Sequence, residues 1–465
     1  MTVTRRNLMK AGGGLVAGAA FGTFGGFMTR RAAKTVLVIC IDCMRADQCG
    51  FHGCNEPTTP ALDALAESAV VFENAYTNGN WTKPAVASFF TGLPVAEHGV
   101  DKSVQPGSAP GQGIALPLGA QTLAGVFARA GYSTAAILHQ PHLVSDLGFA
   151  EGFDHYDQGG YSAERIERRF ARWLAGRARG EPLFAYLHFL DCHGPFVRTK
   201  EYAEVFGRID LGVAIEENWR EPGAWRRFRE QVNSGSRAIP ADLGAHFLNL
   251  YQGRARKVDD AVARVFGMLA KAGRYDEALI AVFADHGENF LEHGALGHRP
   301  EHFYQQQLRI PLVIKFARSL SIPPRRVEAE VETIDLSATL AAAAGGRLGN
   351  GRDLAAAAKG AVPAGRFITT ASDIGMTVVR DGLKAYVSTG GAAAKVTKVV
   401  DVRREDSEAS DVSALQARFV AELNEFLPRW RERAAEKRLV LGKPFGTGAV
   451  SSENVEALRA LGYIQ

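Results

Sequence analysis

The sequence predicts an α/β fold in which helices cover both faces of a mostly parallel central sheet, followed by a small C-terminal antiparallel sheet with a helix. Short apolar runs alternate with amphipathic segments from Thr35 to about Gly345, as expected for a parallel sheet that is buried on both faces. From about residue 346, short strands with tight turns replace this alternation. The chain has 465 residues, of which 46% are hydrophobic, and this is enough for one large core and a smaller unit.

Apolar runs bounded by turn residues identify the expected strands of the large sheet, at 35–41, 133–138, 182–190, 278–284 and 311–316. The expected helices lie at 60–69, 84–91, 121–130, 163–178 and 243–272. The helical period is clearest in 163–178, which places apolar side chains on one face and Arg and Glu on the other. These elements together predict one domain over 35–345.

Residues 200–240 interrupt the alternation, because they are rich in Glu, Arg and Trp and show no strong periodicity. We expect an insertion over the rim of the sheet there, which is either a lid or substrate-specificity element or a surface excursion without a role. The remaining part, 346–465, is expected to form an α+β subdomain. Its predicted strands lie at 367–371, 376–380, 383–388 and 396–402, with a hairpin turn at Asp381-Gly382 and a helix at 411–436.

The first 34 residues have the features of a targeting segment. Thr4-Arg5-Arg6-Asn7-Leu8-Met9-Lys10 is a twin-arginine pattern, and a Gly- and Ala-rich, mildly apolar run follows from Ala11 to Met28. A transmembrane anchor is the alternative, since ~18 residues can just cross a bilayer. We predict export in the folded state by the twin-arginine (Tat) translocase to the periplasm or another extracytoplasmic compartment. An uncleaved segment would leave the protein tethered to the membrane.

Charge and cysteine content exclude some classes of partner and cofactor. The net charge of +4, from 54 basic and 50 acidic residues, is too balanced to indicate a nucleic-acid partner. The spacing of the five cysteines matches no zinc or iron–sulfur pattern. A Cys49–Cys54 disulfide is one alternative, and free buried thiols are the interpretation we favour. The cysteines are Cys40, Cys43, Cys49, Cys54 and Cys192.

Three distant segments place metal-ligand or nucleophile candidates at the ends of apolar runs. Asp42 follows the strand expected at 35–41, Asp285 and His286 follow 278–284, and Thr82 opens a helix that contains Pro84. Ligands collect outside the carboxyl ends of parallel strands, so these four side chains are expected to bind one divalent cation. Carboxylate plus imidazole suits Mn, Zn or Fe better than Ca or Mg. The alternatives are a plain helix-capping Thr and turn-forming Asp residues.

Several motifs occur in a characteristic order along the chain: Asp42-Cys43-Met44-Arg45-Ala46-Asp47, Thr58-Thr59-Pro60-Ala61-Leu62-Asp63-Ala64-Leu65-Ala66, Thr82-Lys83-Pro84-Ala85-Val86-Ala87-Ser88-Phe89-Phe90-Thr91-Gly92, His188-Phe189-Leu190-Asp191-Cys192-His193-Gly194-Pro195-Phe196, Asp285-His286-Gly287-Glu288, Gly297-His298 and Leu461-Gly462-Tyr463-Ile464. In order and spacing they resemble the sulfatase family within the alkaline phosphatase superfamily. The resemblance covers nearly everything from Thr35 on and implies an alkaline-phosphatase-like fold.

This chain departs from that family at the nucleophile. The family carries a Cys or Ser that is oxidised to formylglycine, in a Cys/Ser-x-Pro-Ser-Arg loop, whereas here Thr82, Ala85 and Val86 occupy the three positions. Threonine cannot become the aldehyde hydrate that releases sulfate, so we predict no formylglycine. A phosphorylated threonine can be released, because water can attack phosphorus in line. Cys43 replaces a second Asp and His286 replaces an Asn, which moves the site from the calcium type towards phosphoesterases and phosphonate hydrolases.

The resemblance also implies roles for further residues. His193 and His298 correspond to groups that protonate the leaving oxygen or bind non-bridging oxygens. His139 follows a strand where relatives place a pocket residue. Lys83 could steady an anion beside Thr82, or point to solvent. A second metal is a further possibility, through Asp191, His193 and His298.

We therefore predict an exported, metal-dependent hydrolase of phosphate esters, either diesters or phosphonate monoesters, that forms a covalent intermediate on Thr82. The substrate would be a small-molecule, glycan or lipid ester. One alternative is a sulfatase that works without formylglycine, and another is a transferase that moves a head-group phosphate onto a glycan or lipid. The last is a non-catalytic protein that has kept the metal pocket. The sequence does not indicate the substrate or the oligomeric state.

Overall fold

The computed structural model describes residues 33–442 except 102–113, 208, 210, 212–218, 220, 222, 362–364, 390–393 and 405–407, and in addition 454, 456 and 458. The predicted targeting segment therefore lies outside the described residues up to residue 32, as does the motif 461–464. Among the described helices, none is both long enough and apolar enough to cross a membrane.

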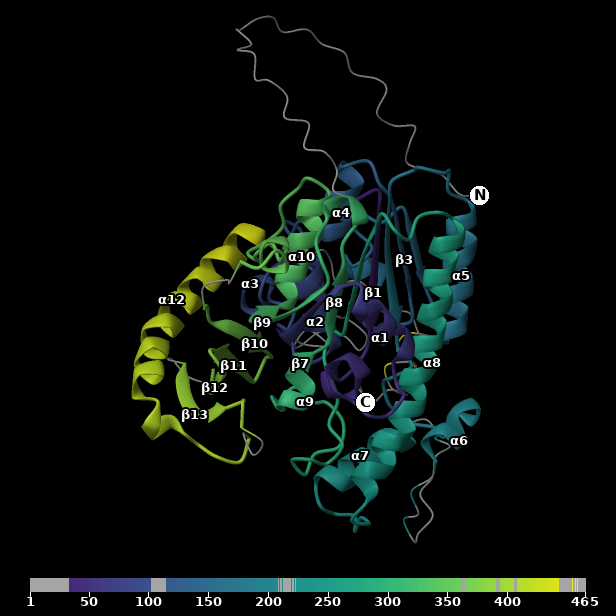
Figure 1. Cartoon of the computed structure of the whole chain (residues 1–465). Coiled ribbons are helices and arrows are strands. Elements are labelled where there is room, and N and C mark those ends of the chain that lie inside the picture. Colours follow the sequence, from purple (N-terminus) through teal and green to yellow (C-terminus); the bar gives the residue numbers. More distant parts are fainter. Residues whose placement is uncertain are drawn as a thin grey trace, which may run out of the picture. The chain divides into compact units, whose positions relative to one another are not determined.

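A nine-stranded sheet forms the centre of the protein, as predicted from the apolar runs (Figure 1). Its order is β4-β3-β5-β1-β6-β8-β2-β7, with β9 beside β2, and the five strands from β4 to β6 are mutually parallel. Only β8 and the short β7 run against their neighbours. The strands are β1 Thr35–Ile41, β2 Val70–Tyr76, β3 Ser133–Leu138, β4 His155–Gln158, β5 Leu183–Phe189, β6 Ala278–Phe283, β7 Arg309–Ile310, β8 Leu312–Lys315 and β9 Arg325–Glu332.

Helices cover both faces of this sheet, which confirms the predicted fold class (Figure 1). On one face α8 packs against both α1 and α5, and on the other α10 packs against α2 and α4. All five helices predicted for the large domain are present. The helices are α1 Pro60–Glu67, α2 Thr82–Thr91, α3 Val95–His98, α4 Leu123–Arg129, α5 Ala163–Ala175, α6 Ala203–Phe206, α7 Ala224–Asn233, α8 Leu243–Lys271, α9 Gln305–Leu308, α10 Thr333–Ala343, α11 Ala355–Ala358 and α12 Ala417–Leu441.

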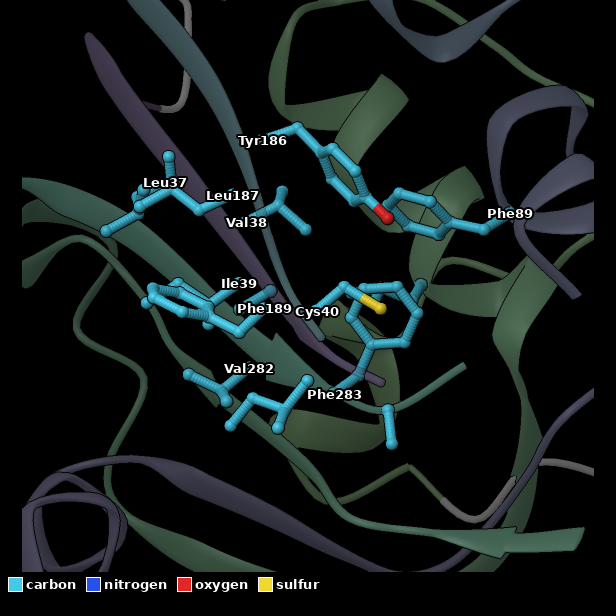
Figure 2. Close-up of a cluster of buried hydrophobic side chains, with 14 of the residues drawn as sticks. Leu37, Val38, Ile39, Cys40, Phe89, Tyr186, Leu187, Phe189, Val282 and Phe283 are labelled. Atoms are coloured by element: carbon cyan, nitrogen blue, oxygen red, sulfur yellow. The ribbon is translucent and has the colours of Figure 1, made fainter. Parts of the chain in front are cut away.

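The core between α2 and the central strands fixes the start of α2. Phe89 of α2 packs against Phe283 of β6, with ring centroids 4.7 Å apart, and stacks at 5.9 Å on Tyr186 of β5. Figure 2 shows these rings beside the buried apolar side chains of β1 and β5. All ten residues of α2 are buried. Because this packing holds the helix rigidly on the sheet, the position of Thr82 at its first turn is also fixed.

The C-terminal region contains a separate antiparallel sheet of order β10-β11-β12-β13. The hairpin turn at Asp381-Gly382 is present, with φ of 54° and 76°. Helix α12 covers this sheet and buries Phe419, Leu423 and Leu427 against it. This helix begins and ends later than the predicted helix 411–436. The domain boundary near residue 345 stays a prediction. The strands are β10 Ile368–Ala371, β11 Gly375–Arg380, β12 Leu383–Ser388 and β13 Lys395–Asp401.

The cysteines are free thiols, as the favoured interpretation predicted. Four are buried and Cys54 is half-buried, so the alternative Cys49–Cys54 disulfide is not formed. A buried thiol behaves as a small apolar side chain, and burial raises the pKa of Cys40, Cys43, Cys49 and Cys192.

Candidate active site

The polar residues of the site come from the carboxyl ends of neighbouring parallel strands. Asp42 directly follows β1, and Asp285 and His286 follow the adjacent β6. On the other side of β1, His188 lies in β5 in register with Cys40, and Gln140 follows β3. Since parallel strands end at the same edge, their polar ends meet there, and Thr82 of α2 joins them from one face.

The hydroxyl of Thr82 lies at the centre of these side chains. Its Oγ1 is 3.2 Å from Nε2 of His286 and 3.4 Å from both Oδ2 of Asp42 and Nε2 of Gln140. The N-cap of α2 is Trp81, so Thr82 is the first helical residue and its hydroxyl contacts the site instead of capping the helix. The interpretation of Thr82 as a plain capping residue is therefore wrong.

Asp42 is buried and ionised. Its Oδ2 accepts a hydrogen bond from Nε2 of Gln140 at 2.7 Å and lies 2.9 Å from Nε2 of His188. The thiol of Cys43 donates to Oδ1 at 3.1 Å. Burial alone would raise the pKa of Asp42, but the hydrogen bond and charge of His188 outweigh it and lower that pKa well below its ordinary value. The hydroxyl of Tyr186 in turn lies 2.7 Å from Nδ1 of His188 and orients the imidazole ring.

Asp285 and His286 lie side by side at the end of β6, and His286 is the one that contacts Thr82. Oδ1 of Asp285 accepts from the backbone N–H groups of Cys43 at 3.2 Å and His286 at 2.9 Å. Among the described residues no hydrogen-bond donor reaches its buried Oδ2, which lies 3.5 Å from Nε2 of His286. Nδ1 of His286 donates to the Gly287 carbonyl at 2.8 Å, which leaves the lone pair of Nε2 facing Thr82. Burial and the charge of Asp42 raise the pKa of Asp285.

These groups fit a divalent cation. Two buried carboxylates face each other, one with an oxygen that lacks a donor, and an imidazole lone pair and a hydroxyl lie beside them. Ligand atoms of Asp42, Cys43 and His286 lie within 4.8 Å of one another, as do those of Asp42, His188 and Asp285. A cation would supply the positive charge that two neighbouring buried carboxylates require.

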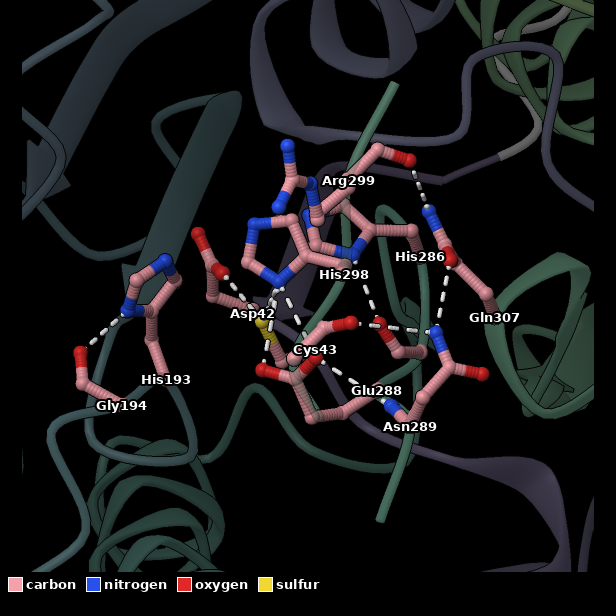
Figure 3. A network of polar contacts seen from close by, with 12 residues as sticks. Asp42, Cys43, His193, Gly194, His286, Glu288, Asn289, His298, Arg299 and Gln307 are labelled. Atoms are coloured by element: carbon pink, nitrogen blue, oxygen red, sulfur yellow. Dashed lines mark hydrogen bonds and ion pairs between the residues drawn. The ribbon is translucent and has the colours of Figure 1, made fainter. Parts of the chain in front are cut away.

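A second group of side chains lies next to this centre (Figure 3). Nδ1 of His298 is 3.2 Å from both carboxylate oxygens of Glu288 and 3.6 Å from the Cys43 sulfur. The ring of His298 lies 4.4 Å from that of His286 and 5.0 Å from that of His193, whose Nδ1 donates to the Gly194 carbonyl. Burial, and then the proximity of His298, lowers the pKa of His193 to about 4. Burial likewise lowers that of His298, so both rings are neutral near pH 7.

The sequence offered Asp191, His193 and His298 as ligands of a second metal, and the structure replaces one of these three residues by another. Ligand atoms of His193 and His298 do lie within 4.8 Å of a common partner, but that partner is Cys43. Asp191 instead pairs with Lys257 at 3.4 Å. The set that the structure brings together therefore combines a thiol with two imidazoles, which is a softer donor set than the one expected.

His139 and Lys83 occupy positions that the sequence left open. Nδ1 of His139 donates to the Tyr161 carbonyl at 2.9 Å, and the next residue, Gln140, is the one that contacts Asp42 and Thr82. Lys83 is only 1% exposed, so it does not point to solvent, and burial lowers its pKa to about 7. Steadying an anion stays the role proposed for Lys83.

Sequence reasoning missed three side chains of the site: Gln140, His188 and the partner of His298, Glu288. A signal existed for His188, because a histidine inside a continuous apolar strand needs a buried polar partner. Glu288 was noticed within Asp285-His286-Gly287-Glu288 but received no role. Gln140 lies one residue beyond the more conspicuous His139, and no periodicity extends past the end of β3.

Comparisons with known proteins identify the family of the chain. The sequence profile of the sulfatase family matches residues 34–346. A 206-residue segment is 30% identical to the multifunctional alkaline phosphatase superfamily protein PehA of Trinickia caryophylli and covers 40% of this chain but only 39% of that relative. The uncharacterized sulfatase YidJ of Escherichia coli K12 is 26% identical over 354 residues, which are 66% of this chain and 67% of YidJ.

The fold also matches solved structures. The phosphonate monoester hydrolase SpPMH from Silicibacter pomeroyi superposes with a TM-score of 0.67 over 87% of this chain and 96% of the other, at 21% sequence identity. At this identity the superposition supports the fold alone, and the reaction has to be argued from the side chains described above.

Proposed function

Since this chain belongs to the sulfatase family of hydrolases, we propose that it cleaves phosphate esters, either diesters or phosphonate monoesters, with Thr82 as nucleophile. The position of the Thr82 hydroxyl carries this proposal. It is buried within 3.4 Å of Asp42, Gln140 and His286 and lies at the first turn of a helix, whose dipole favours an anionic group.

The residues that would hold the cation are Asp42, Thr82, Asp285 and His286. Their carboxylate, hydroxyl and imidazole donors favour Mn, Zn or Fe over Ca or Mg. When bound, such a cation lowers the pKa of the threonine hydroxyl and offsets negative charge on the reacting oxygens. Gln140 and His188 hold Asp42 in place, and the Glu288 carboxylate fixes the ring of His298.

The reaction would proceed in two displacements at phosphorus. The Thr82 hydroxyl loses its proton to solvent, and its Oγ1 forms a bond to phosphorus while the bond to the leaving oxygen breaks. The leaving oxygen takes a proton from the protonated imidazole of His193 or His298, and that imidazole regains a proton from the water of the second displacement. Water then attacks phosphorus in line and restores the threonine. Burial keeps both imidazoles neutral near pH 7, and the negative charge of a bound ester would raise their pKa towards that of a useful acid.

Threonine at position 82 also supports phosphate over sulfate chemistry. The formylglycine hydrate expels sulfate by elimination, and a threonine ester has no equivalent route. Sulfuric ester hydrolysis stays a second candidate, because the matching profile and YidJ both carry the sulfatase name. Turnover of an aryl sulfate in preference to the matching aryl phosphate would support that candidate.

Replacement of the nucleophile tests the proposal. Thr82→Ala should abolish turnover of an aryl phosphodiester and of a phosphonate monoester while the protein still binds one equivalent of Mn or Zn. In the wild-type protein, peptide mapping after rapid quenching of a phosphonate monoester reaction should show Thr82 carrying the mass of the transferred phosphonyl group. Full activity of Thr82→Ala would refute the covalent mechanism. Loss of metal together with activity would show only that Thr82 is a ligand.

We also propose that the protein acts outside the cytoplasm after Tat-dependent export, on the strength of the twin-arginine pattern at Arg5-Arg6. Fusion of residues 1–34 to a reporter that is active only after export, with an Arg5→Lys, Arg6→Lys control, tests this.

A further inference from the structure

Helix α7 of the insertion carries an aromatic cluster that packs against the loops of the active site. Trp225 lies 5.4 Å from Phe196 and 5.5 Å from Phe247, and Phe228 lies 5.7 Å from Phe247, measured between ring centroids. Both Trp225 and Phe228 are buried. These side chains belong to the main hydrophobic core of the protein, so the insertion is not a surface excursion without packing. Helix α7 is drawn in Figure 1.

The same helix is attached to both loops that carry the catalytic histidines. On the His193 loop, a Cβ added at Gly194 would lie 2.8 Å from Nε1 of Trp225, so this contact requires glycine. On the His298 loop, Asn233 forms a reciprocal pair with the backbone of Leu296, accepting from its N–H at 2.8 Å and donating to its carbonyl at 3.0 Å. Helix α7 is therefore part of the wall around His193 and His298.

Arg229 is the residue of α7 whose side chain lies against the loop that carries His298. It lies between Trp225 and Asn233 at one-turn intervals, so all three side chains project from the same face of the helix. Its stem crosses the backbone next to His298, because a Cβ at Gly297 would lie 2.7 Å from Cδ of Arg229. Arg229 as a whole is half-buried, and its charge acts on both Glu288 and His298.

We infer that Arg229 is a specificity residue that binds an anionic group carried by the leaving alcohol of the substrate. This inference rests on the proposed function, in which His193 or His298 protonates the leaving oxygen. A guanidinium beside His298 would meet the leaving alcohol, and its planar fork suits a carboxylate or a second phosphate. The substrate class is then a phosphate or phosphonate ester whose leaving alcohol bears a second negative charge.

Two esters that differ only in this charge test the inference: para-carboxyphenyl phenylphosphonate and its uncharged analogue, para-carbamoylphenyl phenylphosphonate. The wild-type protein should prefer the carboxylate ester in kcat/KM, mainly through KM. Arg229→Gln should lower kcat/KM for the carboxylate ester about 10- to 100-fold more than for the carbamoyl ester, as expected for loss of a charge-assisted hydrogen bond. Arg229→Lys should keep part of the preference, and added salt should weaken it in the wild type.

Arg227→Gln is the matched control, since Arg227 lies on the exposed side of the same helix and pairs with Glu221 at 3.2 Å. This variant should keep the wild-type preference. A carboxylate preference that survives in Arg229→Gln, or equal losses for both esters, would overturn the role of Arg229 while the hydrolase proposal stands. Absence of turnover with both esters in the wild type, under conditions where aryl sulfates react, would overturn the proposed function and this inference with it.

Discussion

Replacement of Gln140 tests whether the site depends on this side chain, one of the three that sequence reasoning missed. Its amide Nε2 donates at 2.7 Å to the ionised, fully buried Asp42 and lies at 3.4 Å from the Thr82 hydroxyl. A hydrogen bond to a charged group contributes about 1.5–3 kcal/mol, whereas a contact at 3.4 Å adds little. Gln140→Leu keeps the approximate volume of the side chain and removes the donor. We therefore expect kcat/KM to fall about 10- to 150-fold.

The assay is steady-state hydrolysis of a phosphonate monoester at saturating Mn or Zn, with the melting temperature measured in parallel. Gln158→Leu is the control, because Gln158 donates to the backbone carbonyl of Gln140 at 2.7 Å and does not touch Asp42. Its effect on kcat/KM should be several-fold smaller. A kcat/KM within threefold of wild type in Gln140→Leu would show that His188 alone suffices to hold Asp42, and the reasoning on Gln140 would be wrong.

Two further predictions concern metal preference and pH. Cys43→Asp combined with His286→Asn makes the donor set all-oxygen, so activation should shift from Mn or Zn towards Ca; unchanged preference in a metal panel would argue against the assigned ligands. His98 is buried and neutral, with Nδ1 accepting from Val100 N–H at 3.0 Å, and burial lowers its pKa to about 3. Below its ordinary pKa of 6.5 only the unfolded state gains this proton. The free energy of unfolding should therefore be highest above pH 6.5 and should fall by up to about 1.4 kcal/mol per pH unit between pH 6.5 and pH 3. Urea unfolding of His98→Gln should show a smaller decrease over the same pH range.

The central part of the fold could be predicted because its strands are buried on both faces. Strands β1, β3, β5 and β6 therefore read as continuous apolar runs, and each was placed within about two residues. The strands on the far side of β8 carry a different pattern. In β2, Glu73 and Asn74 interrupt the run, and β9 alternates charged with apolar residues because only part of it is buried. Neither was predicted, since a strand that contains several charged or amide side chains resembles a polar loop in composition.

The residues of the site also fall into two groups, one that the sequence predicts and one that it does not. Asp42, Asp285 and His286 follow apolar runs directly, so strand ends alone indicate where they meet. Gln140 and Asp191 depend on loop conformation after the strand. Gln140 received no role from the sequence, and the structure groups His193 and His298 with Cys43 and not with Asp191. Asp191 was expected near His298, yet the backbone after β5 turns its carboxylate towards Lys257 on α8, while the neighbouring His193 faces the site. No sequence pattern reports that turn.

The residues of the site differ in what holds them in place, and this limits which substitutions can alter the range of substrates. The proposed nucleophile and the proposed cation ligands are fixed by the central sheet and by α2, whose burial leaves little room for change. His193 and His298 lie on loops held from outside by Trp225 and Asn233 of the insertion. A change in α7 can therefore alter the leaving-group side of the pocket without moving Thr82. Substitutions on α7 should change KM and substrate preference, whereas substitutions at the strand ends should abolish turnover of every substrate alike.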